Sequence, residues 1–184
     1  MQQEPRSTQP LQDGPPAAEG AGLAALAGKY MTFQLAEEVY GLQILKVREI
    51  IGAMEITRMP RAPEFVRGVI NLRGRVIPVV DLRTKFGMPQ VAATEQTVII
   101  VVQVEAAGRA LTMGVLVDLV LEVLDVKAGA IEPTPDLGGG PVEHEFILGV
   151  GKHGHKVVFL LDIAQVLEAH DVATLRAAAA AAAA

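Results

Sequence analysis

The chain has 184 residues, no cysteine and a formal net charge of −5, and 51% of its residues are hydrophobic. This length suits one ordinary domain or two small subdomains that share a core. The lack of cysteine excludes disulfide bridges and cysteine-ligated metal sites, and without a continuous apolar run of about 18 residues we expect no membrane-spanning helix.

Residues 1–28 are rich in Gln, Pro, Ala and Gly, and we predict that they form a disordered N-terminal tail. From Tyr30 onward, short runs of Val and Ile alternate with Gly, Pro and polar turns, which is typical of an all-β domain. We expect strands at residues 30–35, 39–47, 68–71, 76–82, 97–104, 110–117, 147–150 and 157–161.

Two of these runs, residues 98–102 and 157–161, are almost continuously apolar. Strands that face solvent on one side alternate between apolar and polar residues, so these two strands should be covered on both faces. Residues 163–168 could begin a C-terminal helix. The chain ends in eight consecutive alanines, and we treat residues 171–184 as an alanine-rich tail.

The predicted strands belong to an internal repeat. Two constant spacings relate glycines and acidic residues of the first half to identical residues of the second half, and apolar residues align around them. The pairs are Gly68 with Gly149, Asp81 with Asp162, Gly41 with Gly114 and Glu49 with Glu122. The spacing changes between the pairs, which predicts an insertion in the second copy near Gly138, Gly139 and Gly140. Because both aspartates follow an apolar strand, we expect them to satisfy backbone donors at a turn rather than to catalyse a reaction.

The predicted domain carries few side chains suited to catalysis. The single serine of the chain, Ser7, lies in the predicted tail, and the chain has no cysteine. The common serine and cysteine nucleophiles are therefore missing from the predicted domain. The stretch from Gly149 to Gly154 matches Gly-x-Gly-x-x-Gly, but a dinucleotide site requires a helix after this motif. Residues 156–162 have the pattern of a strand instead, which disfavours nucleotide binding.

Histidines near the same motif suggest another site. His153 and His155, with His144 nearby, could hold a metal ion. Gly154 between the first two favours an exposed hairpin tip, where both side chains would simply be solvated.

Charged residues are unevenly distributed along the chain. Residues 58–85 contain seven Arg and Lys residues and two acidic ones, whereas acidic residues outnumber basic ones over residues 86–171. Regions of opposite sign favour two kinds of partner. Nucleic acid is a poor candidate, because no aromatic residue interleaves with Arg67, Arg73 and Arg75 to stack on bases.

Residues from about 30 to about 170 resemble CheW, the coupling protein of bacterial chemosensory arrays. The matching segments are residues 40–50, Pro60 with Pro63, and residues 65–83, 114–120 and 157–163. The resemblance implies two pseudo-symmetric five-stranded SH3-like β-barrels, packed together, with short helices. The CheW-like domain would span residues 29–170, with subdomain 1 at about 29–90 and subdomain 2 at about 91–170.

The resemblance also implies a non-enzymatic adaptor that needs no cofactor. Such a protein would couple the cytoplasmic tip of methyl-accepting chemoreceptors to the regulatory domain of the histidine kinase CheA, in the cytoplasm at the membrane-associated array. The expected receptor-binding residues are Asn71, Leu72, Arg73 and Gly74, and the expected kinase-binding residues are Val47 and Glu49.

Two alternatives remain open from the sequence. The chain could serve a related chemosensory pathway, such as surface motility or development. It could also be a metal- or nucleotide-dependent enzyme that uses the loop from Gly149 to His155.

Overall fold

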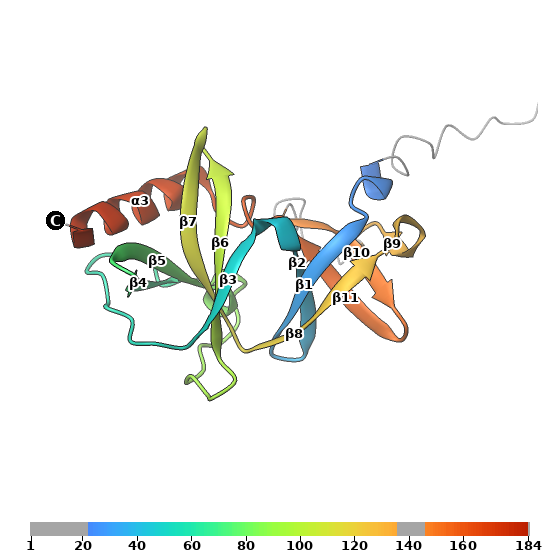
Figure 1. The fold of residues 1–184 in the computed structure, drawn as a ribbon, viewed down its shortest axis with the longest axis horizontal. Helices are drawn as coiled ribbons and strands as arrows, with labels where there is room; N and C mark the ends of the chain where they lie inside the picture. The colour runs from blue at the N-terminus through green and yellow to red at the C-terminus, as the bar shows by residue number, and fades with distance from the viewer. Residues whose placement is uncertain (1–21, 136–145, 184) are drawn as a thin grey trace, which may run out of the picture.

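Residues 22–135 and 146–183, which the computed structural model describes, form two β-sheets with a helix along one side (Figure 1). Sheet 1 has the strand order β8-β1-β2-β11-β10-β9, and sheet 2 has the order β3-β6-β7-β5-β4. The strands of sheet 1 are β1 (Gly28–Leu35), β2 (Glu38–Gln43), β8 (Leu119–Val126), β9 (Ile131–Glu132), β10 (Ile147–His153) and β11 (Lys156–Leu161). The strands of sheet 2 are β3 (Val47–Gly52), β4 (Val66–Leu72), β5 (Arg75–Asp81), β6 (Val98–Ala106) and β7 (Arg109–Val117).

Besides the helical residues 22–24, this part of the chain has η1 (Ile44–Lys46), α2 (Leu82–Lys85), η2 (Ala128–Ala130) and α3 (Ala169–Ala183). The predicted all-β class with short helices is therefore confirmed. Sheet 2 has five strands, and sheet 1 has six over the described ranges because the two-residue strand β9 lies at its edge. Within those ranges, no helix is long and apolar enough to cross a membrane.

Each sheet combines strands from both copies of the repeat. The β1–β2 hairpin of the first copy lies between β8 and β11 of the second copy, and the β6–β7 hairpin of the second copy lies between β3 and β5 of the first. Equivalent parallel ladders join the copies, with Gly41 opposite Leu160 and Gly114 opposite Val79. The copies have thus exchanged their first hairpins.

This exchange changes the predicted domain boundaries. The sheets do not follow the predicted subdomains of about 29–90 and about 91–170, because sheet 2 runs from β3 to β7 and sheet 1 is formed by the segments on both sides of it. A cut near residue 90 would divide both sheets. The sequence could not show this, since strand pairing between the copies is decided by long-range contacts.

The core explains why β6 is apolar over residues 98–102, whereas in β11 the side chain of Val157 is 48% exposed, contrary to the predicted coverage. Within the described residues the core divides into a small cluster in each sheet and a large cluster shared between the sheets. On β6, Ile99 and Val101 lie in the cluster of sheet 2, whereas Ile100 and Val102 lie in the shared cluster. Successive side chains of a strand point to opposite faces, so both faces of β6 are buried, as its sequence predicts.

The repeated aspartates have the expected structural role. Asp81 Oδ1 accepts hydrogen bonds from the amides of Arg83 and Thr84 at 2.9 and 3.4 Å, where α2 begins. Asp162 Oδ1 accepts one from the Ala164 amide at 3.0 Å. Both carboxylates satisfy backbone donors that follow a strand, which accounts for their repetition.

Described residues near both ends of the chain pack onto the fold, and the predicted tail residues 1–21 lie outside the described residues. Part of the predicted tail 1–28 belongs to the fold, because Leu23 packs against sheet 1 and β1 begins at Gly28. The C-terminal helix begins at Ala169, after the expected residues 163–168, and packs against β4 and β5. Leu175 is fully buried in the shared cluster, so the predicted tail contains a helix that packs onto the core with one face, although residues 181–183 are exposed. The predicted insertion at residues 138–140 lies outside the described residues.

Gly114 is a sensitive position of the exchanged β6–β7 hairpin. An added Cβ atom would lie 2.6 Å from Cγ2 of Ile99, a side chain with no exposed surface. We therefore expect Gly114→Ala to lower the free energy of unfolding by about 1–3 kcal/mol, because a close-packed core must shift to admit a methyl group. Urea denaturation measures this change.

Gly52→Ala is the matched control, since a Cβ atom at this glycine of β3 would meet no atom within 4 Å. This variant should not be destabilised. Equal losses of stability in the two variants would contradict the packing described at Gly114.

Candidate functional site

The predicted receptor-binding residues form the turn of the β4–β5 hairpin. Arg73 and Gly74 have φ angles of 53° and 80°, as a tight two-residue hairpin turn requires. Asn71 Oδ1 accepts a hydrogen bond from the Gly74 amide at 2.8 Å. Leu72 pairs with Arg75 at the base of the turn. Asn71 and Gly74 therefore shape the turn, and the Arg73 side chain, 73% exposed, is the group that it presents.

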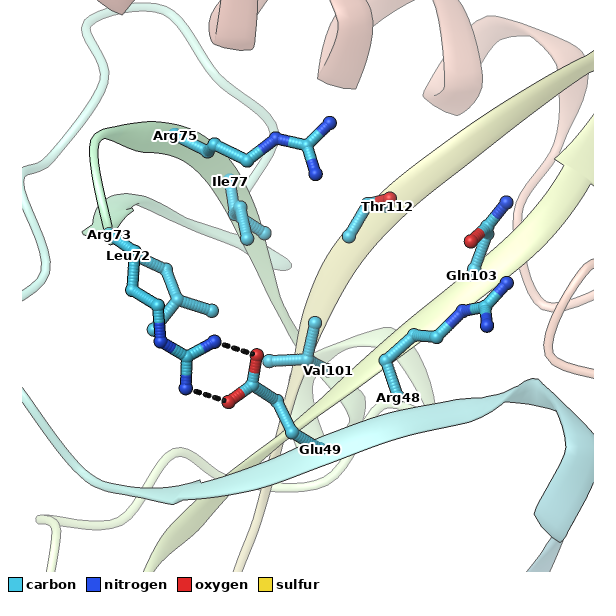
Figure 2. Close-up of a pocket in the computed structure, with 9 residues that line it drawn as sticks. All are labelled: Arg48, Glu49, Leu72, Arg73, Arg75, Ile77, Val101, Gln103 and Thr112. Carbon is cyan, nitrogen blue, oxygen red and sulfur yellow. Dashed lines mark hydrogen bonds and ion pairs between the residues drawn. The ribbon is translucent and has the colours of Figure 1, made fainter.

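Arg73 is engaged by Glu49, which the sequence assigned to the other partner. The guanidinium donates two parallel hydrogen bonds, from Nη1 to Oε1 at 2.9 Å and from Nη2 to Oε2 at 2.8 Å (Figure 2). These hydrogen bonds, followed by the charge of Glu49, raise the pKa of Arg73 above its ordinary value. Glu49 lies on β3 and Arg73 on the β4–β5 turn, so the pair joins the two opposite ends of the strand order of sheet 2.

A hollow of about 560 Å³ lies beside this ion pair. Leu72, Ile77 and Val101 supply apolar surface, and Arg48 and Arg75 bring further positive charge to the same hollow (Figure 2). The remaining lining residues are Glu49, Arg73, Gln103 and Thr112. A surface with this composition can bind an acidic group together with a neighbouring apolar side chain.

The predicted kinase-binding residues lie on β3, the first strand in the order of sheet 2. Val47 and Glu49 are half-buried, and Val47 packs against the shared cluster. The large apolar side chains exposed here are Leu45 of η1, just before β3, at 88%, and Ile50 of β3, at 40%. The sequence did not predict either as a surface residue, because an apolar residue type alone does not show whether its side chain is covered.

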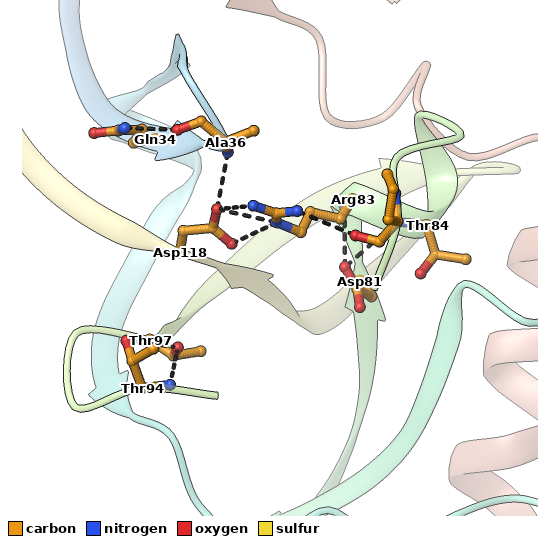
Figure 3. Close-up of polar contacts among 9 residues, drawn as sticks. Gln34, Ala36, Asp81, Arg83, Thr84, Thr94, Thr97 and Asp118 are labelled. Carbon is orange, nitrogen blue, oxygen red and sulfur yellow. Dashed lines mark hydrogen bonds and ion pairs between the residues drawn. The ribbon is translucent and has the colours of Figure 1, made fainter. Parts of the chain in front are cut away.

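Another ion pair, between Arg83 and Asp118, joins sheet 2 to sheet 1. Arg83 follows β5 of sheet 2, and its Nε and Nη2 atoms donate to the carboxylate of Asp118 at 2.7–3.0 Å (Figure 3). Asp118 Oδ2 also accepts a hydrogen bond from the Ala36 amide at 2.8 Å, in the β1–β2 turn of sheet 1. Both charged side chains are largely buried, with exposed fractions of 14% for Arg83 and 26% for Asp118.

The pKa of Asp118 reflects opposing effects. Burial, the largest single effect, raises this pKa, but the Arg83 hydrogen bonds, the Ala36 amide and the Arg83 charge together hold it below its ordinary value. The hydrogen bonds to Asp118 in turn raise the pKa of Arg83. Both members of the Arg83–Asp118 ion pair are therefore charged over the whole neutral pH range.

The predicted glycine motif does not form a nucleotide site. Gly149 lies on β10, and β11 follows the turn at Gly154, so the motif leads into a strand and not into a helix. His153 and His155 are exposed at this hairpin tip, and His144 lies outside the described residues. In the described part of the chain, no three His, Asp or Glu side chains are grouped as a metal site requires.

Known proteins share this architecture. The family description "CheW-like domain" matches residues 29–171. The chain belongs to the CheW family. It is 38% identical to the chemotaxis protein CheW of Klebsiella aerogenes over 161 residues, which cover 83% of this chain and 94% of that protein. It is also 36% identical to the chemotaxis protein CheW of Rhizobium meliloti over 141 residues, which cover 77% and 88%.

A solved structure of the CheW family agrees with the fold. The crystal structure of the scaffolding protein TtCheW from Thermoanaerobacter tengcongensis matches with a TM-score of 0.68 and 34% identity, over 79% of this chain and 97% of that chain. The family predicted from the sequence is confirmed, and the expected coupling role agrees with the names of these CheW proteins.

Protonation of Asp118 should make the stability of the fold depend on pH. Because its folded pKa lies below that of an unfolded aspartate, about 3.9, the ionised pair stabilises the protein above that pH, and the stabilisation is lost as pH falls through the folded pKa. We expect Asp118→Asn to be less stable than the wild type by about 1–3 kcal/mol near neutral pH, with a smaller difference in acid. Urea denaturation at several pH values measures it.

Asp125→Asn is a suitable control, because Asp125 pairs with Lys127 at the surface and is 50% exposed. The hydrogen bond from Lys127 lowers the pKa of Asp125 as well, but solvent and salt screen this exposed pair, so at every pH the free energy of unfolding of this variant should stay close to that of the wild type. A difference for Asp118→Asn that stays constant down to the acid limit would contradict the ionisation described.

Proposed function

We propose that this chain is a non-enzymatic adaptor that couples the cytoplasmic tip of methyl-accepting chemoreceptors to the regulatory domain of the histidine kinase CheA. The observation that carries the proposal is a pair of distinct surfaces on a CheW-family protein: the arginine-lined hollow of sheet 2, and the exposed apolar residues Leu45, just before β3, and Ile50 of β3. Such a protein acts in the cytoplasm, at the membrane-associated array, where both partners lie.

The hollow beside Arg73 is suited to the receptor. A carboxylate at the tip of a receptor helix can replace Glu49 on the planar fork of Arg73, because both acids accept the same two parallel hydrogen bonds. An apolar side chain of the same helix can fill the space over Leu72 and Ile77. Glu49 then acts as an internal competitor that keeps Arg73 oriented while the receptor is absent.

The edge of β3 is suited to the kinase. Leu45 and Ile50 expose apolar surface to water, so burying this surface against a partner is favourable. Val47 packs against the core on the other side of the strand. The β3–β6 ladder shifts its register between Val47 and Glu49. A bulge of this kind discourages the simple addition of a further strand, so contact through side chains is favoured at this edge.

A related chemosensory pathway, such as one for surface motility or development, would use the same two surfaces. Binding to purified receptor tips from each pathway separates this alternative from the first.

Arg73→Glu tests the receptor surface. The substitution places like charges at positions 49 and 73 and removes the fork, so we expect binding to a receptor-tip fragment to weaken by about tenfold to a hundredfold. Kinase binding should change little. The measurement is titration of the folded variant against each purified partner, and unchanged receptor affinity would refute the role of Arg73.

Glu49→Gln distinguishes the internal competitor from a kinase contact. Because the neutral amide holds Arg73 less tightly, receptor affinity should rise and kinase affinity should stay constant. A loss of kinase affinity with no change in receptor affinity would instead assign Glu49 to the kinase surface, as first expected from the sequence.

Leu45→Arg tests the kinase surface. This side chain is 88% exposed, so the substitution should leave the free energy of unfolding within about 0.5 kcal/mol of the wild type. Affinity for the CheA regulatory domain should fall about tenfold or more, because a charge would be buried against apolar surface. Val157→Arg, at a 48% exposed position of β11, is the matched control and should bind as the wild type does.

A further inference from the structure

The chain passes from one sheet to the other at two pseudo-symmetric links. Residues 44–46 of η1 join β2 of sheet 1 to β3 of sheet 2, and Asp118 joins β7 of sheet 2 to β8 of sheet 1. In Figure 1 the first link crosses at the upper side of the molecule and the second at the lower side. Each link therefore holds one end of the contact between the sheets.

Among the described residues, an ion pair is present at the lower link and none at the upper link. At the lower link, Asp118 holds Arg83, which follows sheet 2, and the Ala36 amide of sheet 1 at the same time. In the internal repeat, Leu45 is the equivalent of Asp118, at the spacing that relates Gly41 to Gly114. Ala164 is the equivalent of Arg83, at the spacing that relates Gly68 to Gly149. Leucine and alanine cannot form an ion pair, so these repeat-equivalent positions give the upper link no such polar contact.

The position of Leu45 consequently depends on the angle between the sheets. Leu45 lies in the link itself, between a strand of sheet 1 and a strand of sheet 2, whereas Ile50 belongs to sheet 2 alone. A rotation of one sheet against the other moves Leu45 relative to Ile50. The same rotation leaves Arg73 and Glu49 in place, because both belong to sheet 2.

We infer that Arg83 and Asp118 are positioning residues for kinase docking: their ion pair fixes the angle between the sheets and thereby holds Leu45 in register with Ile50. This inference rests on the proposed function for its binding consequence. Its structural part, a fixed angle between the sheets, stands independently.

The test compares Arg83→Met with Lys85→Met. Both substitutions remove a cation from α2, but Lys85 Nζ pairs with Asp171 of α3 at 2.7 Å and makes no link to sheet 1. For Arg83→Met we expect affinity for the CheA regulatory domain to fall about fivefold or more, and receptor-tip affinity to stay within about twofold. Lys85→Met should leave both affinities unchanged. Arg83→Lys keeps the charge but not the planar fork, so its kinase affinity should lie between those of the wild type and Arg83→Met.

Distances between spin labels report the angle directly. The chain has no cysteine, so Glu105→Cys on β6 and Lys156→Cys on β11 give one exposed label on each sheet without background. We expect Arg83→Met to broaden or shift the distance distribution, and Lys85→Met to leave it unchanged.

An unchanged distribution in Arg83→Met would overturn the inference, as would a changed distribution with full kinase affinity. Equal loss of kinase binding in both methionine variants would also overturn it, because general destabilisation would then explain the effect. If the wild type does not bind the kinase domain at all, the proposed function fails, and the labels alone decide whether the ion pair fixes the sheets.

Discussion

In each sheet a hairpin from one copy of the repeat lies between strands of the other copy, and the two parallel ladders at Gly41 and Gly114 hold this arrangement. Neither sheet can form until segments far apart in the chain have met, which carries a large entropic cost. Burial of apolar surface in the shared cluster offsets that cost. The sheets are therefore one cooperative unit, and every surface feature takes its position from their union.

Aromatic contacts concentrate at this union. The ring of Tyr40, on sheet 1, lies 5.8 Å from that of Phe33 and 5.6 Å from those of Phe86 and Phe159. Phe86 directly follows α2, the short helix that also carries Arg83. One helical turn thus contributes both an aromatic contact and an ion pair to the contact between sheets, and the chain uses its few aromatic residues mainly for this purpose.

The two proposed binding surfaces lie where the strand order of sheet 2 ends. Local turn chemistry at Asn71 and Gly74 determines where Arg73 stands, and a contact across the sheet with Glu49 determines where its fork points. The exposed edge of β3 follows from the same topology, because the terminal strand of a sheet has a neighbouring strand on only one side. An adaptor of this kind needs no catalytic group: it needs two surfaces held at a constant separation.

The sequence by itself determined features that depend on local pattern: eight of the strand regions, the coverage of β6 on both faces and the structural role of Asp81. It missed β3, β8 and β9. Only the tertiary structure decided which strands pair between the copies, that Arg73 meets Glu49, and that one face of α3 is buried against the core. The reason is physical. Periodicity and turn residues report the surroundings of a short segment, whereas these contacts join residues whose distance along the chain gives no sign of their proximity in space.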